Sequence, residues 1–184
     1  MSDQLGWKVA FGAPAAMERL GLARPLVAPL AASGLLGSGA TVSLAGWTRP
    51  VLEVEVAIWI GSGLGAAIEL VDIEFPPDDV ERILASGIYH RHVLIGPPLS
   101  AALDDVTARV TCNGATVAGT DDPTPLTGPH EDVLDAVRAT AGRDLRDGEV
   151  VIAGAVVPPL PVAPGQRWHT DLGRLGSLDV AFTS

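Results

Sequence analysis

Cysteine is almost absent from the sequence, because Cys112 is the only one among 184 residues. A single cysteine excludes an intramolecular disulfide and a zinc site built from several thiolates. The sequence also lacks a glycine-rich phosphate-binding loop and the G-x-S-x-G turn of serine hydrolases. Any chemistry of this chain must therefore be sought among other side chains.

Positive charge is scarce as well. The chain has 12 Lys and Arg against 22 Asp and Glu, which gives a formal net charge of -10. Nucleic acids and anionic membranes are bound by cationic surfaces, so the composition argues against both as partners. It suits a small-molecule enzyme, or a protein whose carboxylates are neutralised by a metal ion.

Targeting and membrane-spanning segments are not indicated either. The apolar run at 56–68 is too short and too glycine-rich to cross a bilayer. The opening "MSDQLGWK" has no basic region followed by an apolar one, so it does not resemble a signal peptide. We expect a soluble cytoplasmic protein.

The sequence is rich in apolar residues, glycine and proline. Hydrophobic residues make up 47% of the chain and the mean hydropathy is +0.32, enough for a folded core. The 21 Gly and 15 Pro favour turns and short strands over a helical bundle. No repeat or low-complexity linker interrupts the chain, so we expect one domain over 1–184.

Strand patterns dominate. Apolar residues alternate with others over 51–60 and 106–112, and Asn113-Gly114 predicts a hairpin turn after the latter. The run at 149–157 is continuously apolar, as in a strand buried on both faces. A last strand is expected in 177–184. Short helices are expected within 13–22, 76–87 and 128–142, and 119–129 reads as a loop.

Two glutamates interrupt the first of these strands. Glu53 and Glu55 point to one face, with backbones about 6.5–7 Å apart, and Glu is depleted in strands. Two unneutralised carboxylates at that spacing repel each other. A hard divalent cation would reverse the penalty, since Mg²⁺ and Mn²⁺ prefer carboxylate oxygens. The alternative is a strand with one solvated face.

A third carboxylate favours the metal interpretation. Glu69 stands on an apolar side of the next strand-like segment, where an unpaired buried charge would be costly. No basic residue occurs between Arg49 and Arg82 to pair with it. A metal shared with the other two glutamates would serve. Asp72 and Glu74 lie on the opposite face, and we expect both to be solvated.

Basic candidates are fewer. Lys8, in "GWKVAFG", could hold a substrate carboxylate, although an exposed surface lysine is the alternative. His90 and His92 are two positions apart on an expected strand and could act as acid–base groups or ligands. Ordinary surface or hydrogen-bonded histidines are the alternative there. His130 and His169 suggest no role.

Several pieces of the sequence, in one order, resemble the 2-keto-4-pentenoate hydratase and 2-oxo-hexenedioate decarboxylase branch of the fumarylacetoacetate hydrolase superfamily. The Glu-x-Glu strand and the segment "LRDGEVVIAGAVVPPLPVAPGQR" are the most specific of them. The matching pieces are "GWKVAFG", "RPVLEVEVAIWIG", "AAIELVD", "ASGIYHRHVLIGPP", "LRDGEVVIAGAVVPPLPVAPGQR" and "LGSLDVAFTS".

The resemblance implies an α+β, β-rich fold: a rolled mixed β-sheet with short peripheral helices. It implies Mg²⁺ or Mn²⁺ held by Glu53, Glu55 and Glu69, with Lys8 contacting a 2-oxo acid. Beyond the resemblance, we expect His90 or His92 to carry a proton. The expected activity is a hydratase or decarboxylase (a lyase) of aromatic catabolism that stabilises an enolate. A homo-oligomer is also implied. Its interface, or alternatively the core, would take the tryptophans Trp7, Trp47, Trp59 and Trp168.

The sequence departs from the family pattern around the site. Relatives of this branch carry a longer segment between the Glu-x-Glu pair and the third carboxylate, and their Ala-Asp-Asn signature is "RILASG" here. Groups around a metal site commonly decide which reaction it performs. Two alternatives therefore stand beside the lyase: a catalytically degenerate chain that assembles with a related enzyme, and a metal-dependent acylpyruvate-type hydrolase or isomerase.

Overall fold

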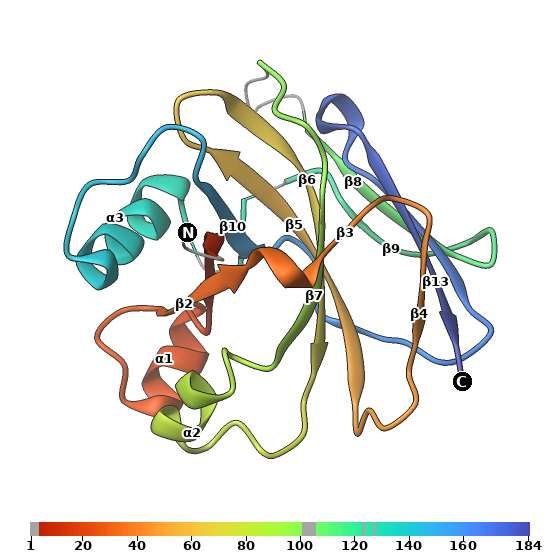
Figure 1. Cartoon of the computed structure of the whole chain (residues 1–184), viewed down its shortest axis with the longest axis horizontal. Coiled ribbons are helices and arrows are strands. Elements are labelled where there is room, and N and C mark those ends of the chain that lie inside the picture. The colour runs from red at the N-terminus through yellow and green to blue at the C-terminus, as the bar shows by residue number, and fades with distance from the viewer. Residues whose placement is uncertain (1–3, 101–105, 123, 127) are drawn as a thin grey trace.

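The computed structural model describes residues 4–100, 106–122, 124–126 and 128–184, which form two β-sheets with short helices at one side (Figure 1). The larger sheet has eight strands, with β11 (Leu160–Pro161) paired to β5. Its other strands run in the order β2 (Leu26–Ala31), β1 (Gln4–Ala10), β10 (Val150–Ala155), β5 (Pro50–Trp59), β6 (Gly63–Asp72), β7 (His90–Ile95) and β3 (Leu35–Leu36). The second sheet runs β4 (Ala40–Ser43), β13 (Ser177–Thr183), β12 (Arg167–Asp171), β8 (Ala108–Cys112) and β9 (Ala115–Thr120).

The larger sheet is mixed, because β1 pairs with β10 and β3 with β7 in parallel while its other pairs are antiparallel. The expected β-rich α+β fold is confirmed. Each of these strands expected from the sequence is present: β5, β8 and β9 around Asn113-Gly114, β10 and β13. Asn113 and Gly114 have φ of 50° and 82°, which an Asn-Gly hairpin turn adopts readily.

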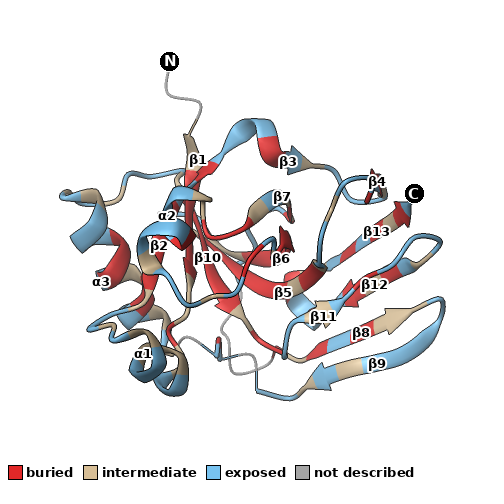
Figure 2. Ribbon diagram, turned by 90° about the horizontal axis from the view of Figure 1, so that it is seen from below, coloured by how far each residue is buried: buried red, intermediate tan, exposed pale blue. Residues whose placement is uncertain are grey.

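The two faces of the larger sheet have different partners. Leu52, Val54 and Val56 of β5 pack with Ile68 of β6 against the second sheet, in the main hydrophobic cluster. At the other end of the same face, α3 (His130–Ala141) covers β1 and β10 through Val133 and its neighbours. The sheet curls away from these layers, so its opposite face lines the inside of the curl (Figure 2).

The three α-helices within the described part of the chain are short and peripheral (Figure 1). Two of them, α1 (Pro14–Leu20) and α3, end at a left-handed glycine, Gly21 or Gly142, as their sequences predict. The third, α2 (Val80–Ala85), begins at Asp79, whose carboxylate accepts the Arg82 N–H at 3.1 Å. Two 3₁₀ turns, at Ala32–Gly34 and Gly173–Leu175, complete the helices described.

One expectation about exposure needs correction. Asp72 is buried instead of solvated: it accepts backbone N–H bonds from Thr48 at 2.9 Å and Arg49 at 2.7 Å, and faces the Arg91 guanidinium at 3.4 Å. Glu74 is exposed, as expected. Among the tryptophans, Trp7 and Trp168 lie in the hydrophobic clusters, while Trp47 and Trp59 are half-buried. These bonds tie Asp72, at the end of β6, to the two residues that lead into β5.

A search of the described residues finds no helix that is long and apolar enough to span a membrane.

Replacing Asp72 by Ala is expected to lower the free energy of unfolding by about 2–4 kcal/mol, because two backbone N–H groups and a guanidinium lose their buried acceptor. Urea unfolding measures this. The matched control is Glu74→Ala, which removes an exposed carboxylate that also contacts Arg91 and should cost less than about 1 kcal/mol. Equal losses for the two variants would contradict the assigned role of Asp72.

Candidate metal centre and substrate cavity

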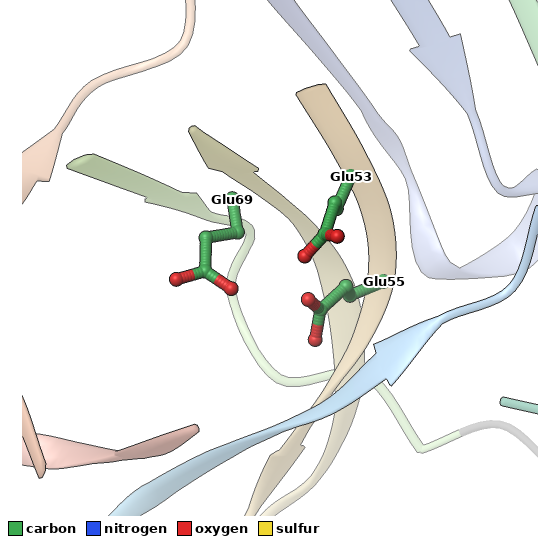
Figure 3. A group of neighbouring side chains, drawn as sticks. All are labelled: Glu53, Glu55 and Glu69. Carbon is green, nitrogen blue, oxygen red and sulfur yellow. The ribbon is translucent and has the colours of Figure 1, made fainter. Parts of the chain in front are cut away.

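Three carboxylates meet on the inner face of the β5–β6 hairpin (Figure 3). The antiparallel register places Glu53 directly opposite Glu69, and Glu55 follows two residues along β5 on the same face. One oxygen from each lies within 4.8 Å of the others. Glu55 and Glu69 are buried and Glu53 is half-buried. The arrangement follows from strand pairing alone, and it brings the three predicted ligands together.

Lys8 reaches the same place from β1. Its ammonium group contacts the Glu69 carboxylate and donates to the backbone carbonyl of Ile88 at 2.9 Å. The side chain is 1% exposed, and Lys8 is the only lysine in the chain. The alternative of an exposed surface lysine is therefore wrong. Burial of a charged ammonium demands an anionic partner, and Glu69 supplies it.

The two histidine candidates are separated by an irregularity in the sheet. A register shift lies between Leu70 and Val71 of β6, opposite β7, so that His92 pairs with Leu70 and His90 with Val71. Successive residues of β6 face opposite sides, and the two histidines therefore do too. The register thus separates the two candidate histidines onto opposite faces of the sheet.

The neighbours of the two histidines differ accordingly. His90 Nδ1 lies 2.7 Å from Oε1 of Glu69, so this histidine joins the carboxylate cluster. His92 instead stacks on Trp47, with ring centroids 6.2 Å apart, and burial lowers its pKa. No contact among the described residues joins His92 to the three glutamates. The sequence pattern could not reveal this difference, because it depends on the register shift.

The Glu55 carboxylate is held by a backbone N–H group instead of a cationic side chain. A bulge between Ile152 and Ala155 of β10 turns the Gly154 N–H toward β5, where it donates to Glu55 Oε2 at 2.7 Å. Gly154 has φ of 96°, which glycine adopts without strain. Bulges commonly redirect groups beside active sites. This one gives the buried Glu55 carboxylate a hydrogen-bond donor from the backbone rather than from a cation.

The cluster carries more negative charge than its surroundings compensate. Burial, and then repulsion from Glu69, raise the pKa of Glu53 to about 7. The same causes and the nearby Glu53 raise the pKa of Glu55 well above its ordinary value. Burial opposes ionisation of Glu69 too, but Lys8 and His90 outweigh it and lower its pKa. One ammonium thus stabilises one of three carboxylates, which is the electrostatic setting of a cation site.

A cavity of about 240 Å³ opens beside this cluster. Lys8 and Glu53 lie at its wall, together with Gly154 and the left-handed residues Ile88 and Tyr89. The remaining lining includes the apolar side chains Val9, Phe11, Val71, Ile73 and Leu126. A concave apolar space with a few polar groups at one end is the usual form of a small-molecule site.

Part of this wall could not be predicted from the sequence. Ile88 and Tyr89 have φ of 56° and 62°, uncommon for non-glycine residues and especially for a β-branched one. The Ser86 hydroxyl accepts the Tyr89 N–H at 3.1 Å, and the Tyr89 hydroxyl donates to the Phe75 carbonyl at 3.1 Å. These bonds hold the turn that aims the Ile88 carbonyl at Lys8. In the sequence, only Gly87 indicates a turn at this place, because it is expected to end the preceding helix.

The site implies a pH-dependent stability of the metal-free protein. With its folded pKa raised to about 7, Glu53 keeps a proton between pH 4.5 and 7 that it loses on unfolding. The free energy of unfolding therefore falls as pH rises through this window. In the presence of a chelator, the native chain should lose on the order of 2 kcal/mol more than Glu53→Gln between pH 5 and 8. Urea titrations at both pH values measure this, and parallel losses would contradict it.

Comparison with known proteins gives both a sequence relative and structural neighbours. No protein-family model matches the sequence. A curated relative, the TodF product hydratase of Pseudomonas putida, is 28% identical over 208 residues, covering 97% of this chain and 76% of the relative. The sequence relationship thus runs along nearly the whole chain and leads to an enzyme.

The structural neighbours share the fold. The 4-oxalocrotonate decarboxylase of Pseudomonas putida G7, solved with magnesium and adipate, superposes with a TM-score of 0.83 at 18% identity, over 97% of this chain and 78% of that one. A 5-carboxymethyl-2-hydroxymuconate delta-isomerase from Mycobacterium smegmatis gives 0.70 at 16% identity, over 98% and 78%. At these identities the likeness establishes the fold, and the residues of the site must carry the chemistry.

Proposed function

Because the chain belongs to the fumarylacetoacetate hydrolase superfamily, in its hydratase and decarboxylase branch, we propose that it is a divalent-metal-dependent lyase. Its substrate would be a small 2-oxo or 2-hydroxydienoic acid, and its reaction a hydration or a decarboxylation that passes through an enolate. The relatives described above and their structural neighbours include a hydratase, a decarboxylase and isomerases, all of which are enzymes. Of these activities, we propose hydration or decarboxylation for this chain.

One observation carries the proposal: three carboxylates and the only lysine of the chain converge beside one small cavity. Each of these charges is costly to bury, and none is needed to hold β5 and β6 together, since the hairpin is already paired along ten positions. Buried charges concentrated at a cavity mark functional sites more often than structural ones. The cluster is thus better explained by ligand binding than by stability.

The donor set fits Mg²⁺ or Mn²⁺. Glu53, Glu55 and Glu69 offer hard carboxylate oxygens, and such ions take a few carboxylates while leaving positions for water or substrate. Burial and mutual repulsion raise the pKa of Glu53 and Glu55, and a bound cation would offset this cost of ionisation. When bound, the metal would act as a Lewis acid toward the negative charge that develops on the 2-oxo group.

The protein's own groups would bind and orient the substrate. Lys8 lines the cavity, and its ammonium has a third hydrogen available after Glu69 and the Ile88 carbonyl have taken two. It is therefore placed to hold the carboxylate of the substrate. Glu69 and the Ile88 carbonyl fix the position of this ammonium, and His90 fixes Glu69 in turn.

The roles proposed for the histidines are unequal. His90 is not part of the cavity wall, so we assign it to positioning Glu69 rather than to direct proton transfer. His92, packed on Trp47, is the weaker proton carrier of the two. The proton that the reaction needs at carbon would then come from water.

The catalytically degenerate alternative has one supporting observation. The turn between β5 and β6 spans only residues 60–62, so no longer segment shields the cluster on that side. Under this alternative the chain would assemble with an active relative and would turn over no substrate by itself. If the chain is instead an active lyase, we propose that it assembles with copies of itself.

Activity measurements distinguish the lyase from the catalytically degenerate chain and from a hydrolase or isomerase. The purified, Mg²⁺-loaded chain is expected to convert a 2-hydroxydienoic or 2-oxo acid, and product identification by NMR would distinguish hydration, decarboxylation, hydrolysis and isomerisation. Lys8→Met keeps the length of the side chain without its charge, and should lower kcat/KM by about 100-fold or more while leaving Mg²⁺ affinity unreduced. Arg19→Met, a change on the surface of α1, is the control. Full activity of Lys8→Met would contradict the assigned role.

A further inference from the structure

Unfavourable backbone conformations in this chain are concentrated at the cavity. Among the described residues, the non-glycine residues with a positive φ are Phe11, Ile88, Tyr89 and Asn113. Asn113 lies in the hairpin turn between β8 and β9, where asparagine is common. The other three line the cavity beside the carboxylate cluster. Strained backbone persists only where its surroundings hold it, and such residues cluster at functional sites.

Three left-handed residues follow one another where α2 leads into β7 (Figure 1). They are Gly87, Ile88 and Tyr89, with φ of 67°, 56° and 62°. A left-handed conformation suits the glycine but is unfavourable for the two residues after it, most of all for the β-branched isoleucine. Local preferences therefore do not produce this turn, and tertiary contacts must impose it.

Ser86 and Tyr89 supply these contacts from the two ends of the turn. The Ser86 hydroxyl donates to the Ile83 carbonyl at 2.8 Å and accepts the Tyr89 N–H at 3.1 Å, which ties the turn to α2. The Tyr89 hydroxyl donates to the Phe75 carbonyl at 3.1 Å, and the two rings pack with their centroids 4.8 Å apart. Two side chains thus hold a backbone conformation that the residues of the turn disfavour.

The turn directs one carbonyl group to the charged cluster. The Ile88 carbonyl accepts from the Lys8 ammonium at 2.9 Å, and Glu69 is the other acceptor of that ammonium among the described residues. Lys8 is 1% exposed, so its hydrogens need acceptors within the protein. Without the carbonyl, the ammonium would be attracted to Glu69 alone, and its third hydrogen would have no fixed direction.

We propose that Ser86 and Tyr89 are positioning residues for Lys8, and that they act through the Ile88 carbonyl, which fixes the direction of the ammonium group. This inference rests on the proposed function, in which Lys8 holds the substrate carboxylate. A fixed ammonium speeds the reaction because the substrate is then held close to its reactive geometry. The strained turn thus costs folding free energy and serves the site.

The single lysine of the chain makes this geometry measurable without any reaction. Lysine labelled with ¹³C gives NMR signals from Lys8 alone. A fixed ammonium group makes the two hydrogens on Cε inequivalent, so the native chain should show two resolved Hε shifts. In Ser86→Ala these shifts should collapse toward one averaged value, whereas Ser86→Thr keeps the hydroxyl and should restore the separation. One averaged shift in the native chain, or unchanged shifts in Ser86→Ala, would overturn the proposal.

Kinetics of the Mg²⁺-loaded chain test whether this geometry matters for turnover. Ser86→Ala and Tyr89→Phe each remove one hydroxyl that holds the turn. Each should lower kcat by about 10-fold without reducing Mg²⁺ affinity, and Ser86→Thr should stay close to the native chain. Ile83→Val is the control, because it removes a buried methyl group from the same hydrophobic cluster but keeps the Ile83 carbonyl. It should destabilise the fold and leave kcat unchanged.

The outcomes separate this inference from the proposed function. Collapsed Lys8 shifts in Ser86→Ala, in a native chain that converts no 2-oxo or 2-hydroxydienoic acid, would support the positioning of Lys8 and contradict the lyase. An active native chain whose Ser86→Ala and Tyr89→Phe variants keep the native kcat would support the lyase and contradict the inference. An equal loss of kcat in Ile83→Val would also contradict the inference, because general loosening of the fold would then explain the effect.

Discussion

The repulsion among three carboxylates on one hairpin is the constraint on which the site depends. The β5–β6 register leaves Glu53 and Glu69 directly opposite each other, with Glu55 alongside, on the inner and mostly buried face of the sheet. In a low-dielectric setting such charges cannot all remain ionised without compensation. Lys8 compensates Glu69, whereas burial first, and then repulsion from neighbouring carboxylates, raise the pKa of both other carboxyls.

The surrounding fold serves this arrangement in two ways. The curl of the large sheet brings β1, which is not adjacent to β5 or β6, close enough for Lys8 to meet Glu69. Irregularities then adjust single groups: the bulge in β10 presents the Gly154 N–H to Glu55, and the shift between β6 and β7 turns His90 to Glu69 and His92 to Trp47. A regular sheet would neither present the Gly154 N–H to Glu55 nor turn the two histidines to opposite faces.

Hydrophobic layers on the opposite side of the large sheet hold this charged face in place. The second sheet and α3 cover the outer face of the large sheet, so the strands that carry the charged groups are anchored by apolar contacts on the opposite side. Stability and chemistry are thus divided between the two faces of the same strands. This division also explains the cavity, because the inner face is apolar beyond the cluster and a ligand there meets few polar groups.

The alternation of β5 was enough to predict that Glu53 and Glu55 share a face, and the apolar surroundings of Glu69 added the third carboxylate. The hairpin itself follows from local sequence, which is why these predictions match the structure. The contact of Lys8 with Glu69 could not be predicted from spacing, because it depends on the parallel pairing of β1 with β10, distant in the chain.

Local irregularity limited the other predictions. Two histidines at i and i+2 predict a shared face only in a regular strand, and the register shift removes that regularity. Asp72 looked solvated because its partners, the N–H groups of Thr48 and Arg49, are backbone groups that no side-chain pattern reveals. The left-handed turn at Ile88 and Tyr89 runs against the preferences of its residues, and is held by tertiary contacts.

The central claim is that the three glutamates bind a divalent metal, and calorimetric titration with Mn²⁺ tests it most directly. The native chain should bind one Mn²⁺, and Glu53→Gln should bind it at least about 10-fold more weakly, because one anionic ligand is lost. Glu81→Gln, an exposed change in α2, should bind as the native chain does. Unaltered Mn²⁺ affinity in Glu53→Gln would contradict the account.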